Sequence, residues 1–365
     1  MKKVFKRLFK LLLILVLVLV LALAALIGVL SATEYNPASV EEAETVPLPG
    51  AAPAPDMRSI APGAELKILS WNIGYAGLGA ASDFVIDGGE HMRAADKATV
   101  ETYLAGIDAT IKAGDYDLVL LQEVDKSSAR TYRIDETMAL ASGFSFFAPN
   151  YRCLYVPNPN TYFIDPFGKV DSGLMTIVEG CPVERAERQA LPCPFSWPLR
   201  IVNLKRCLLA NYLPIEGSDR QLVLVNLHLE AYDDGEGKLA QTRQLMDFLA
   251  QEYEKGNYVI AGGDFNQVFP GSLEAYPNTH PENWIPGILE ESSLPEGFRY
   301  VYDLDTPSCR LLNQPYDPSD TANTQYYVID GLIVSPNVTV NEVETLDLGF
   351  ENADHNPVSV TVTLG

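Results

Sequence analysis

The sequence predicts an α/β (α+β) fold in which two packed β-sheets are covered by helices, preceded by one N-terminal transmembrane helix. Three observations lead to this prediction: strand-like apolar runs are numerous, helical patterns are few, and one very long apolar run lies near the N-terminus. Several of the strand-like runs are continuously apolar, which is typical of strands buried on both faces. Sheets of that kind need helices over their outer faces.

The first thirty residues have the composition of a membrane anchor. Residues 1–10 hold five positive charges, and residues 11–30 are unbroken apolar sequence. At about 1.5 Å per residue this run can cross the roughly 30 Å hydrocarbon core of a bilayer. A cleaved signal would need a small-x-small exit, which Leu30 before Ser31-Ala32 fits poorly. We expect an uncleaved, single-pass anchor in the cell membrane, with residues 1–10 in the cytoplasm and everything after Ser31 extracytoplasmic.

Residues 31–63 are expected to form a linker. Proline, alanine and glutamate dominate this stretch, and no periodic apolar face is visible in it. Proline cannot join a β-ladder or a helix interior, and such a composition buries too little apolar surface to repay ordering. The segment should therefore be an extended tether between the membrane and the main domain, residues 64–365.

The composition of this domain limits its possible partners. Its roughly 300 residues can bury a single large core. The net charge of the chain is −22, and without the five positive charges of the tail it is near −27. Such a surface argues against non-specific clamping of duplex DNA, although a bound divalent cation could still admit one phosphate. The five cysteines lack C-x-x-C spacing, which disfavours a zinc site and leaves any disulfide pairing open.

The first half of the body is expected to contain strands whose ends carry polar residues. Residues Leu66–Ser70 alternate and lead into Asn72. Asp117–Gln122 is a short, apolar strand, and Glu123 follows at its end. Between them, His91–Ala113 has apolar residues at helical spacing. Further strands are expected at Leu174–Val178, Cys207–Tyr212 and Leu222–Leu227.

The second half begins with the clearest helix, Gly237–Glu254, whose apolar face includes Leu239 and Leu245. Tyr258–Ala261 is a buried strand, and Gly262-Gly263-Asp264 is expected to turn out of it. The closing strands are expected at Tyr327–Val334, Val338–Leu346 and Val358–Leu364. Polar residues recur just past strand ends, where a rigid scaffold can aim them at one point.

Asp264 and Asn266 are the first candidate site residues. They lie two apart in extended chain, so their side chains should point the same way while Phe265 faces the core. A charged acceptor beside a neutral donor and acceptor suits a water nucleophile and a phosphate oxygen. The alternative is an Asx-type turn, for which D-x-N is common.

Glu123 and Asn72 form a second candidate group. A carboxylate that closes an apolar strand is costly to bury unless it is paired or binds a metal. Hard oxygen ligands of this kind suit Mg²⁺ or Mn²⁺. The alternatives are a solvated carboxylate for Glu123 and an ordinary turn residue for Asn72.

Two of the four histidines also lie beside strands. His228 ends a buried strand, and His355 comes just before the last one. Asp354 could share a metal or phosphate site with His355. Asp330 is a carboxylate inside a strand-like run and needs a partner, for which His355 is the natural candidate. Either histidine could instead be a satisfied core or turn residue.

Six short motifs follow one another along the chain. They are W-N at Trp71-Asn72, L-L-Q-E-V at Leu120–Val124, N-x-H-L at Asn226–Leu229, G-D-F-N at Gly263–Asn266, I-D at Ile329-Asp330 and D-H-N-P-V at Asp354–Val358. In this order they resemble the endonuclease/exonuclease/phosphatase superfamily of DNase I-like hydrolases, over Leu66–Gly365. The resemblance implies a four-layer sandwich of two mixed β-sheets flanked by helices, with a divalent metal at the sheet edge.

The resemblance also implies which residues hold the metal. It makes Glu123 a metal ligand, with Asn72 beside it contacting the metal or the phosphate. Asp354 is a further candidate ligand. The implied cofactor is Mg²⁺ or Mn²⁺.

The catalytic roles are implied in the same way. Asp264 would orient or deprotonate the attacking water, and Asn266 would hold a phosphate oxygen. His355, oriented by Asp330, would stabilise the pentavalent transition state or act as general base. His228 would contact the phosphate and could protonate the leaving oxygen. The set is chemically coherent, because the metal neutralises developing charge while the carboxylate–imidazole pair transfers the proton.

Several features are expected to set the specificity. Leu227, Gly331 and Ala353 stand where the family commonly has Thr, an aromatic residue and Ser. Two insertions, Asn150–Gly168 and Gln267–Tyr326, should shape the entrance, and their aromatic residues could stack a base, lie against lipid or pack under the loops. A basic stretch could guide a phosphate or balance acidic neighbours; it consists of Arg185, Arg188, Arg200, Lys205 and Arg206.

The sequence therefore predicts a divalent-metal-dependent phosphodiester hydrolase with nuclease-like chemistry. The alternative is a phospholipid or sphingolipid phosphodiesterase, for which the anchor would bring enzyme and substrate together. A binding module that has lost catalysis is disfavoured, because the motif residues keep competent chemistry. The expected partners are a phosphoester substrate, either nucleic acid or phospholipid, and the membrane through the N-terminal helix. No obligate protein partner is evident.

Overall fold

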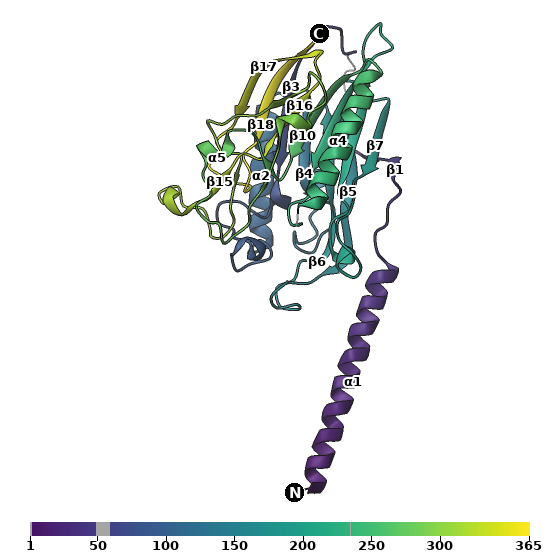
Figure 1. Ribbon diagram of the computed structural model, residues 1–365, viewed down its shortest axis with the longest axis vertical. Helices are drawn as coiled ribbons and strands as arrows, with labels where there is room; N and C mark the ends of the chain where they lie inside the picture. Colours follow the sequence, from purple (N-terminus) through teal and green to yellow (C-terminus); the bar gives the residue numbers. More distant parts are fainter. Residues whose placement is uncertain (1, 49–58, 234) are drawn as a thin grey trace.

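Two seven-stranded β-sheets pack face to face in the computed structural model, which describes residues 2–48, 59–233 and 235–365 (Figure 1). The first sheet has the order β17 (Val338–Thr345), β18 (Val358–Leu364), β3 (Glu65–Asn72), β4 (Leu118–Asp125), β6 (Gly168–Val178), β5 (Phe144–Val156), β2 (Glu44–Val46). The second has the order β1 (Val40–Glu42), β7 (Arg185–Ala190), β8 (Cys207–Pro214), β9 (Gln221–His228), β10 (Tyr258–Asp264), β16 (Asp330–Val334), β13 (Arg299–Val301). Both are mixed, because β3 runs parallel to β4 and β9 runs parallel to β10, while other neighbours are antiparallel. The predicted fold class is confirmed.

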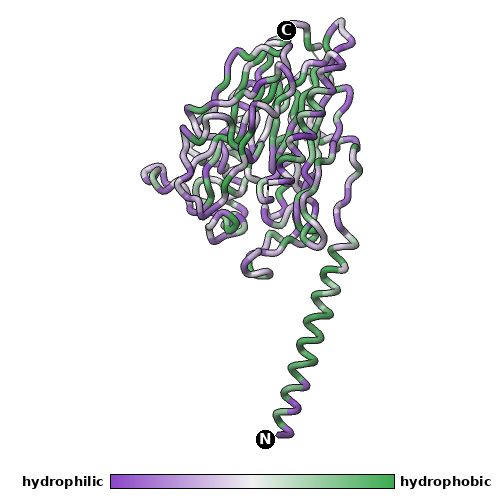
Figure 2. Tube along the Cα trace, viewed as in Figure 1, coloured by the Kyte–Doolittle hydropathy of each residue, from purple (hydrophilic) through white to green (hydrophobic). Residues whose placement is uncertain are grey.

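Aliphatic side chains from both sheets fill the space between them. Ile68 and Leu120 from the first sheet meet a cluster that includes Leu224, Ile260 and Leu332 from the second, and all five are 0 % exposed. Figure 2 shows the corresponding hydrophobic strands inside the body. Full burial of each such side chain contributes about 1.5–3 kcal/mol, so this core holds the strand ends in fixed positions.

The outer face of the first sheet is covered by α2 (Lys97–Ala113), which packs Ile107 against it. The helix begins at Lys97, whereas the sequence predicted a start at His91. Asp96 explains the later start, because its side chain accepts a 2.8 Å hydrogen bond from the backbone N–H of Thr99 and caps the first turn.

The outer face of the second sheet is covered by α4 (Glu236–Glu254), whose Leu245 and Leu249 are fully buried. Leu239 was predicted on the same face but is 60 % exposed. At about 100° per residue, a position six residues before Leu245 lies roughly 120° around the helix from it. The prediction for Leu239 was therefore wrong.

The helix α1 (Lys2–Ala32) projects from the body and is long and apolar enough to cross a membrane or to serve as a signal sequence (Figures 1 and 2). Its last turns contact the body. Leu30 is buried and Leu26 is partly buried in a cluster that includes Tyr151 and Ile201. The apolar run thus ends against the folded domain.

Part of the segment predicted as an extended linker belongs to the sandwich instead. β1 pairs with β7 at one edge of the second sheet, and β2 pairs with β5 at one edge of the first. Glu44 of β2 forms 2.7 Å ion pairs with both Lys126 and Arg152, which anchor this polar strand. The tether prediction is therefore wrong for residues 40–46, and its prolines Pro49, Pro53 and Pro55 lie outside the described residues.

Two strands differ from the prediction. β5 was not predicted, and with β6 it forms a hairpin that includes the start of the insertion expected at Asn150–Gly168. Pro149 and two shifts of register interrupt the alternating pattern by which the strand could have been predicted. β10 continues through its glycines to Asp264, where a turn was expected. A Cβ on Gly263 would lie 1.9 Å from the carbonyl oxygen of Leu227, so only glycine lets β10 approach β9 here.

The second insertion, Gln267–Tyr326, folds into short elements beside the sandwich. They include α5 (Ser272–Ala275) and two-stranded sheets formed by β11 (Gln267–Val268) with β12 (Gly287–Ile288), and by β14 (Cys309–Arg310) with β15 (Tyr326–Tyr327). The strand predicted at Tyr327–Val334 is thus divided between β15 and β16. A short helix, α3 (Glu136–Leu140), precedes β5.

Candidate active site

Polar side chains from both sheets meet at one edge of the sandwich. Asn72 ends β3, His228 ends β9 and Asp264 ends β10. Within the second sheet, Asp264 pairs with His228 on one side and with Asp330, the first residue of β16, on the other. Strand pairing alone therefore brings three of the predicted residues together.

Asn72 lies between the two halves of this group. Its Nδ2 donates to Asp264 Oδ2 at 3.0 Å and to Glu123 Oε1 at 3.4 Å. The same nitrogen lies 3.4 Å from Nε2 of His355. Its Oδ1 accepts a 3.1 Å hydrogen bond from the N–H of Gly74, which fixes the orientation of the amide.

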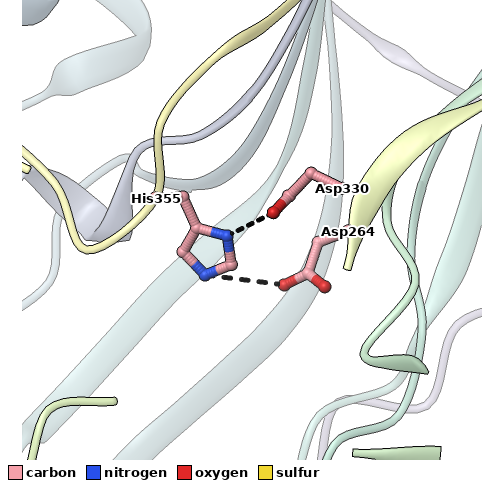
Figure 3. Close-up of side chains that lie close together, drawn as sticks. All are labelled: Asp264, Asp330 and His355. Carbon is pink, nitrogen blue, oxygen red and sulfur yellow. Dashed lines mark hydrogen bonds and ion pairs between the residues drawn. The ribbon is translucent and has the colours of Figure 1, made fainter. Parts of the chain in front are cut away.

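His355 belongs to a buried series of hydrogen bonds next to Asp264. Its Nδ1 lies 2.8 Å from Asp330 Oδ2, and the hydroxyl of Ser308 donates to the same oxygen at 2.7 Å. Burial alone would lower the pKa of His355, but the Asp330 carboxylate raises it well above its usual value. Figure 3 shows the imidazole between the two carboxylates, with Nε2 3.9 Å from Asp264 Oδ2.

His228 contacts the other side of Asp264, with Nε2 3.3 Å from Oδ2 of that residue. Burial, and then the charges of Arg206 and His355, lower the pKa of His228 well below its usual value. The imidazole is therefore neutral, and its contact with Asp264 is not an ion pair between opposite charges. Within the described part of the chain, its Nδ1 has no hydrogen-bond partner.

The turn after β10 positions Asn266. Its backbone N–H donates to Asp264 Oδ1 at 2.8 Å, and its Nδ2 donates to the carbonyl of Leu229 at 2.9 Å. The Asx-type turn considered as an alternative is thus present, at a φ of 50° for Asn266, and both side chains still reach the cavity. Phe265 is fully buried, as expected. Burial, and then the charge of Asp330, raise the pKa of Asp264 to about 7.

Glu123 and Asp354 form an acidic group beside Asn72. Glu123 sits at a bulge in β4 with a φ of 55°, a left-handed conformation that is unusual for glutamate, and its side chain is 25 % exposed. Burial raises the pKa of Asp354 to about 7, and the charge of Glu123 adds to this rise. Among the described residues, Asp354 Oδ1 has no hydrogen-bond partner. Two carboxylates that line the same cavity, one of them with an unsatisfied buried oxygen, fit a divalent cation with oxygen ligands.

A second set of possible ligands consists of Asp264, Asp330 and His355, whose ligand atoms lie within 4.8 Å of one another. Here Oδ2 of Asp330 is already bonded to His355 and to Ser308, while its Oδ1 has no hydrogen-bond partner among the described residues. This set therefore resembles a proton-transfer chain more than an open metal site.

All eight predicted site residues come together around one cavity of about 430 Å³. Seven of them line it: Asn72, Glu123, His228, Asp264, Asn266, Asp354 and His355. Asp330 lies behind His355 and reaches the cavity only through that imidazole. Both insertions contribute to the wall, the first with Tyr151 and Phe167 and the second with Trp284.

Two residues at this site were not predicted. Ser308 carries no charge or motif that marks it in the sequence, and it reaches Asp330 only through the fold. Arg206 was noted only as one of five basic residues. It lines the cavity, is 3 % exposed, and its Nε and Nη1 have no hydrogen-bond partner in the described regions.

The other members of the basic stretch are engaged elsewhere. Arg200 and Lys205 form ion pairs with Glu34, and Arg185 forms one with Glu187. The guanidinium of Arg188 is buried and donates to backbone carbonyls. Only Arg206 of this stretch is therefore placed to meet a ligand in the cavity.

Comparisons with known proteins agree with this fold. A model of the Endonuclease/Exonuclease/phosphatase family matches residues 69–355. An endonuclease/exonuclease/phosphatase from Beutenbergia cavernae is similar in structure at 18 % identity and a TM-score of 0.54, over 82 % of this chain and 72 % of that one. The human Nocturnin catalytic domain is similar at 19 % identity and a TM-score of 0.51, over 85 % and 98 % of the two chains.

A third similar structure is that of ANGEL2, described as a 2′,3′-cyclic phosphatase, at 15 % identity and a TM-score of 0.51, over 83 % and 96 % of the two chains. At these identities the likeness shows the fold alone. A comparison with curated proteins finds no match.

Proposed function

Because the chain belongs to the endonuclease/exonuclease/phosphatase family, we propose that it is a divalent-metal-dependent phosphodiester hydrolase in which water attacks phosphorus. One observation carries this proposal: Asp264 lies between two imidazoles, 3.3 Å from His228 and 3.9 Å from His355, next to an acidic group suited to a cation. Such a centre can bind a phosphate and move a proton at the same point.

The metal would be Mg²⁺ or Mn²⁺, held by Glu123 and Asp354 with Asn72 at its side. The fit rests on the oxygen character of these groups and on the unsatisfied Oδ1 of Asp354. When bound, the cation would neutralise negative charge that develops on the phosphate.

Side chains of the protein would activate the water, stabilise the charge on phosphorus and bind the phosphate. Asp264 would orient the attacking water and accept its proton. His355, held by Asp330, would stabilise the charge on pentavalent phosphorus, and neutral His228 would contact the phosphate close to the leaving oxygen. Asn266 would hold a further phosphate oxygen.

The proposed location rests on the N-terminal segment, and the proposed substrate class rests on the chemistry of the site. We place residues 1–10 in the cytoplasm, residues 11–30 in the cell membrane and the catalytic domain outside the cytoplasm, because basic residues precede the apolar helix. Nuclease-like and lipid-directed phosphodiesterases share this chemistry. An inactive binding module is disfavoured, since seven of the predicted residues line one cavity and His355 contacts Asp330 as expected.

The test uses the full chain in detergent micelles with bis-p-nitrophenyl phosphate and Mg²⁺ or Mn²⁺. Loss of the positioned imidazole in His355→Ala should lower kcat by about 10²–10⁴-fold. His91→Ala is the matched control, because His91 lies outside the cavity and its side chain is 62 % exposed. Circular dichroism would establish that both variants fold. Undiminished turnover in folded His355→Ala would sink the mechanism.

A further inference from the structure

The cavity extends well beyond the catalytic residues. Its far end, called here the apolar lobe, is lined by Leu78, Phe84, Met92, Tyr151, Val156 and Phe167. These side chains belong to one hydrophobic cluster that is separate from the cores between and outside the sheets. A ligand bound at Asp264 could therefore place an apolar group in this lobe.

One charged residue in the wall of the cavity, Arg130, is already neutralised. The guanidinium of Arg130 makes two hydrogen bonds of 3.0 and 2.9 Å with Asp125, and a third of 3.2 Å with Ser172. The ring of Tyr75 lies over it at 3.6 Å. This wall consequently presents aromatic and aliphatic surface to a ligand, and Arg130 has little left to offer a second phosphate.

The surroundings of the cavity do not suit a polyanion. The chain carries a net charge of −22, and four of the five residues of the basic stretch are held by glutamates or by backbone carbonyls. A nucleic acid would need a positive track along its backbone. Arg206 and Arg310 line the cavity, and Nη1 and Nη2 of Arg310 already donate to backbone carbonyls. Two isolated arginines provide no such track.

The lobe lies where the apolar helix α1 meets the body. Leu26 and Leu30 of α1 pack in the same hydrophobic cluster as Tyr151, Val156 and Phe167 of the lobe. Since α1 has the length and composition of a membrane span, a bilayer around it would reach the end of the body that carries the lobe. Figure 1 shows the β5–β6 connection at that same end.

Two loops beside the lobe expose large apolar side chains. We call these residues the rim: Tyr162, Phe163, Ile164, Trp197 and Leu199, which are between 56 % and 72 % exposed. Tyr162 and Leu199 also line the cavity, so part of the rim borders it. Trp197 donates a 3.0 Å hydrogen bond to Ser31 at the end of α1, which ties the rim to the helix. Exposed Trp, Tyr and aliphatic residues in such a place are typical of a surface that enters a bilayer interface.

We infer that the apolar lobe is a binding site for the hydrocarbon chain of a membrane lipid whose phosphodiester is the substrate. The lipid would enter across the rim from the bilayer around α1, with its phosphate beside Asp264 and its chain against Val156 and Phe167. This inference rests on the proposed hydrolase function and specifies its substrate class.

The reaction is a plain hydrolysis. The oxygen of water forms a new bond to phosphorus, one P–O ester bond breaks, and the proton lost by water passes to Asp264. The leaving alkoxide takes up a proton, so the products are a phosphomonoester and an alcohol, and no oxidant or reductant is needed.

The first test measures chain-length dependence with monomeric ethyl, butyl and octyl p-nitrophenyl phosphate on the full chain in micelles of a fixed detergent. If the lobe binds hydrocarbon, KM should fall by up to about fourfold for each added CH₂ until the lobe is filled, with little change in kcat. Val156→Phe, which fills part of the lobe, should remove most of this dependence.

The second test uses the full chain in vesicles of phosphatidylcholine and phosphatidylglycerol. The double variant Phe163→Ser/Ile164→Ser changes rim residues that are 69 % and 72 % exposed, so folding should not suffer. It should lower lipid hydrolysis, relative to hydrolysis of the ethyl ester, by at least about fivefold. The matched control is Leu239→Ser, 60 % exposed on α4, which should change neither activity.

The outcomes separate the two proposals. Two results would overturn the lipid inference and leave the hydrolase function standing. In the first, the ethyl ester is hydrolysed but KM does not depend on chain length. In the second, single-stranded DNA is hydrolysed in preference to vesicle lipid. Absence of metal-dependent turnover of every ester overturns the hydrolase function and the inference with it. Chain-length dependence that Val156→Phe removes, together with rim-dependent lipid hydrolysis, supports both.

Discussion

At the scale of single residues, Arg206 stands out because it is buried without being fully paired. Its nearest carboxylate oxygen, on Glu230, is 3.9 Å from Nε, too far for a hydrogen bond. Leaving guanidinium donors buried and unsatisfied is costly, and that cost is relieved if a bound phosphate accepts from them. Burial lowers the pKa of His228, and the charge of Arg206 lowers it further.

We predict that Arg206→Met lowers kcat/KM for bis-p-nitrophenyl phosphate by about 10–100-fold, because a hydrogen bond to a charged group is worth about 1.5–3 kcal/mol. Arg185→Met is the control, since this arginine has a 53 % exposed side chain outside the cavity and is paired with Glu187. Steady-state kinetics of both variants check the prediction. Equal activity of the two would show that Arg206 only supports the fold.

Asp87 gives a second prediction, for stability. It is 9 % exposed, and burial raises its pKa to about 6 despite a 3.1 Å hydrogen bond from the hydroxyl of Tyr232. Between its ordinary pKa of 3.8 and 6 the folded state holds more protons than the unfolded state, so stability falls as pH rises through this window. The stability of Asp87→Asn should not fall in this way as the pH rises. It should exceed the wild type at pH 7 by up to about 3 kcal/mol, with no such advantage below pH 4.

Denaturant unfolding at a series of pH values, in EDTA, would measure this difference. EDTA removes any cation held near Glu123, whose charge also acts on Asp87. A difference between the two proteins that stays constant from pH 4 to pH 7 would contradict the prediction.

The site residues that could be identified from the sequence are those marked by a short motif or by a charge next to an apolar run. Asp264 and Asn266 share a short motif, and Glu123 is a charge at the end of an apolar strand. Ser308 has no such signal. Its hydroxyl accepts from the N–H of Asp330 and donates to the carboxylate of the same residue, and both contacts arise only when β16 is in place.

At the scale of elements, the strands that the sequence revealed are those buried on both faces, such as β9 and β10, because their apolar runs are continuous. The three-residue strands β1 and β2 contain Glu41, Glu42 and Glu44 and have no apolar pattern. They form because the edges of β7 and β5 offer unpaired backbone groups and because Lys126 and Arg152 hold Glu44. Such strands depend on partners distant in the chain, which periodicity cannot show.

We predict that these edge strands are required for a stable soluble body. A protein that begins at residue 33 keeps β1 and β2, whereas one that begins at residue 64 exposes two sheet edges and leaves Lys126 and Arg152 without Glu44. The shorter protein should melt several degrees lower and aggregate more readily. Scanning calorimetry and size-exclusion chromatography of the two would show it. Equal melting temperatures would mean that β1 and β2 add nothing to the fold.

At the scale of the whole molecule, the site is assembled from both sheets. Asn72 and Glu123 come from the first sheet, while His228, Asp264 and Asp330 come from the second. The apolar core between the sheets therefore sets the distance between Glu123 of the first sheet and Asp264 of the second. Sequence order predicts that these residues belong to one site, but the shape of the cavity that they line depends on how the loops pack, which no local pattern encodes.

This division of the site predicts how a metal acts on global stability. Burial disfavours the ionised form of Asp354 in the metal-free protein, and the charge of Glu123 adds to this effect. A cation that binds only the folded state adds RT ln(1 + [L]/Kd), about 2.7 kcal/mol at a hundredfold excess over Kd. Mg²⁺ or Mn²⁺ should therefore raise the melting temperature by several degrees, and EDTA should reverse the rise.

Asp354→Asn should change both the melting temperature without metal and the gain in melting temperature with metal. Without metal it should melt higher than the wild type, because it removes a buried carboxylate whose pKa burial raises to about 7. With metal it should gain little, because it loses a ligand. Glu101→Gln on α2, a carboxylate with a 55 % exposed side chain that is paired with Lys97, is the control and should respond to metal as the wild type does. If Asp354→Asn gains as much from Mn²⁺ as the control, the cation binds elsewhere. The set of Asp264, Asp330 and His355 would then be the remaining place for it among the described residues.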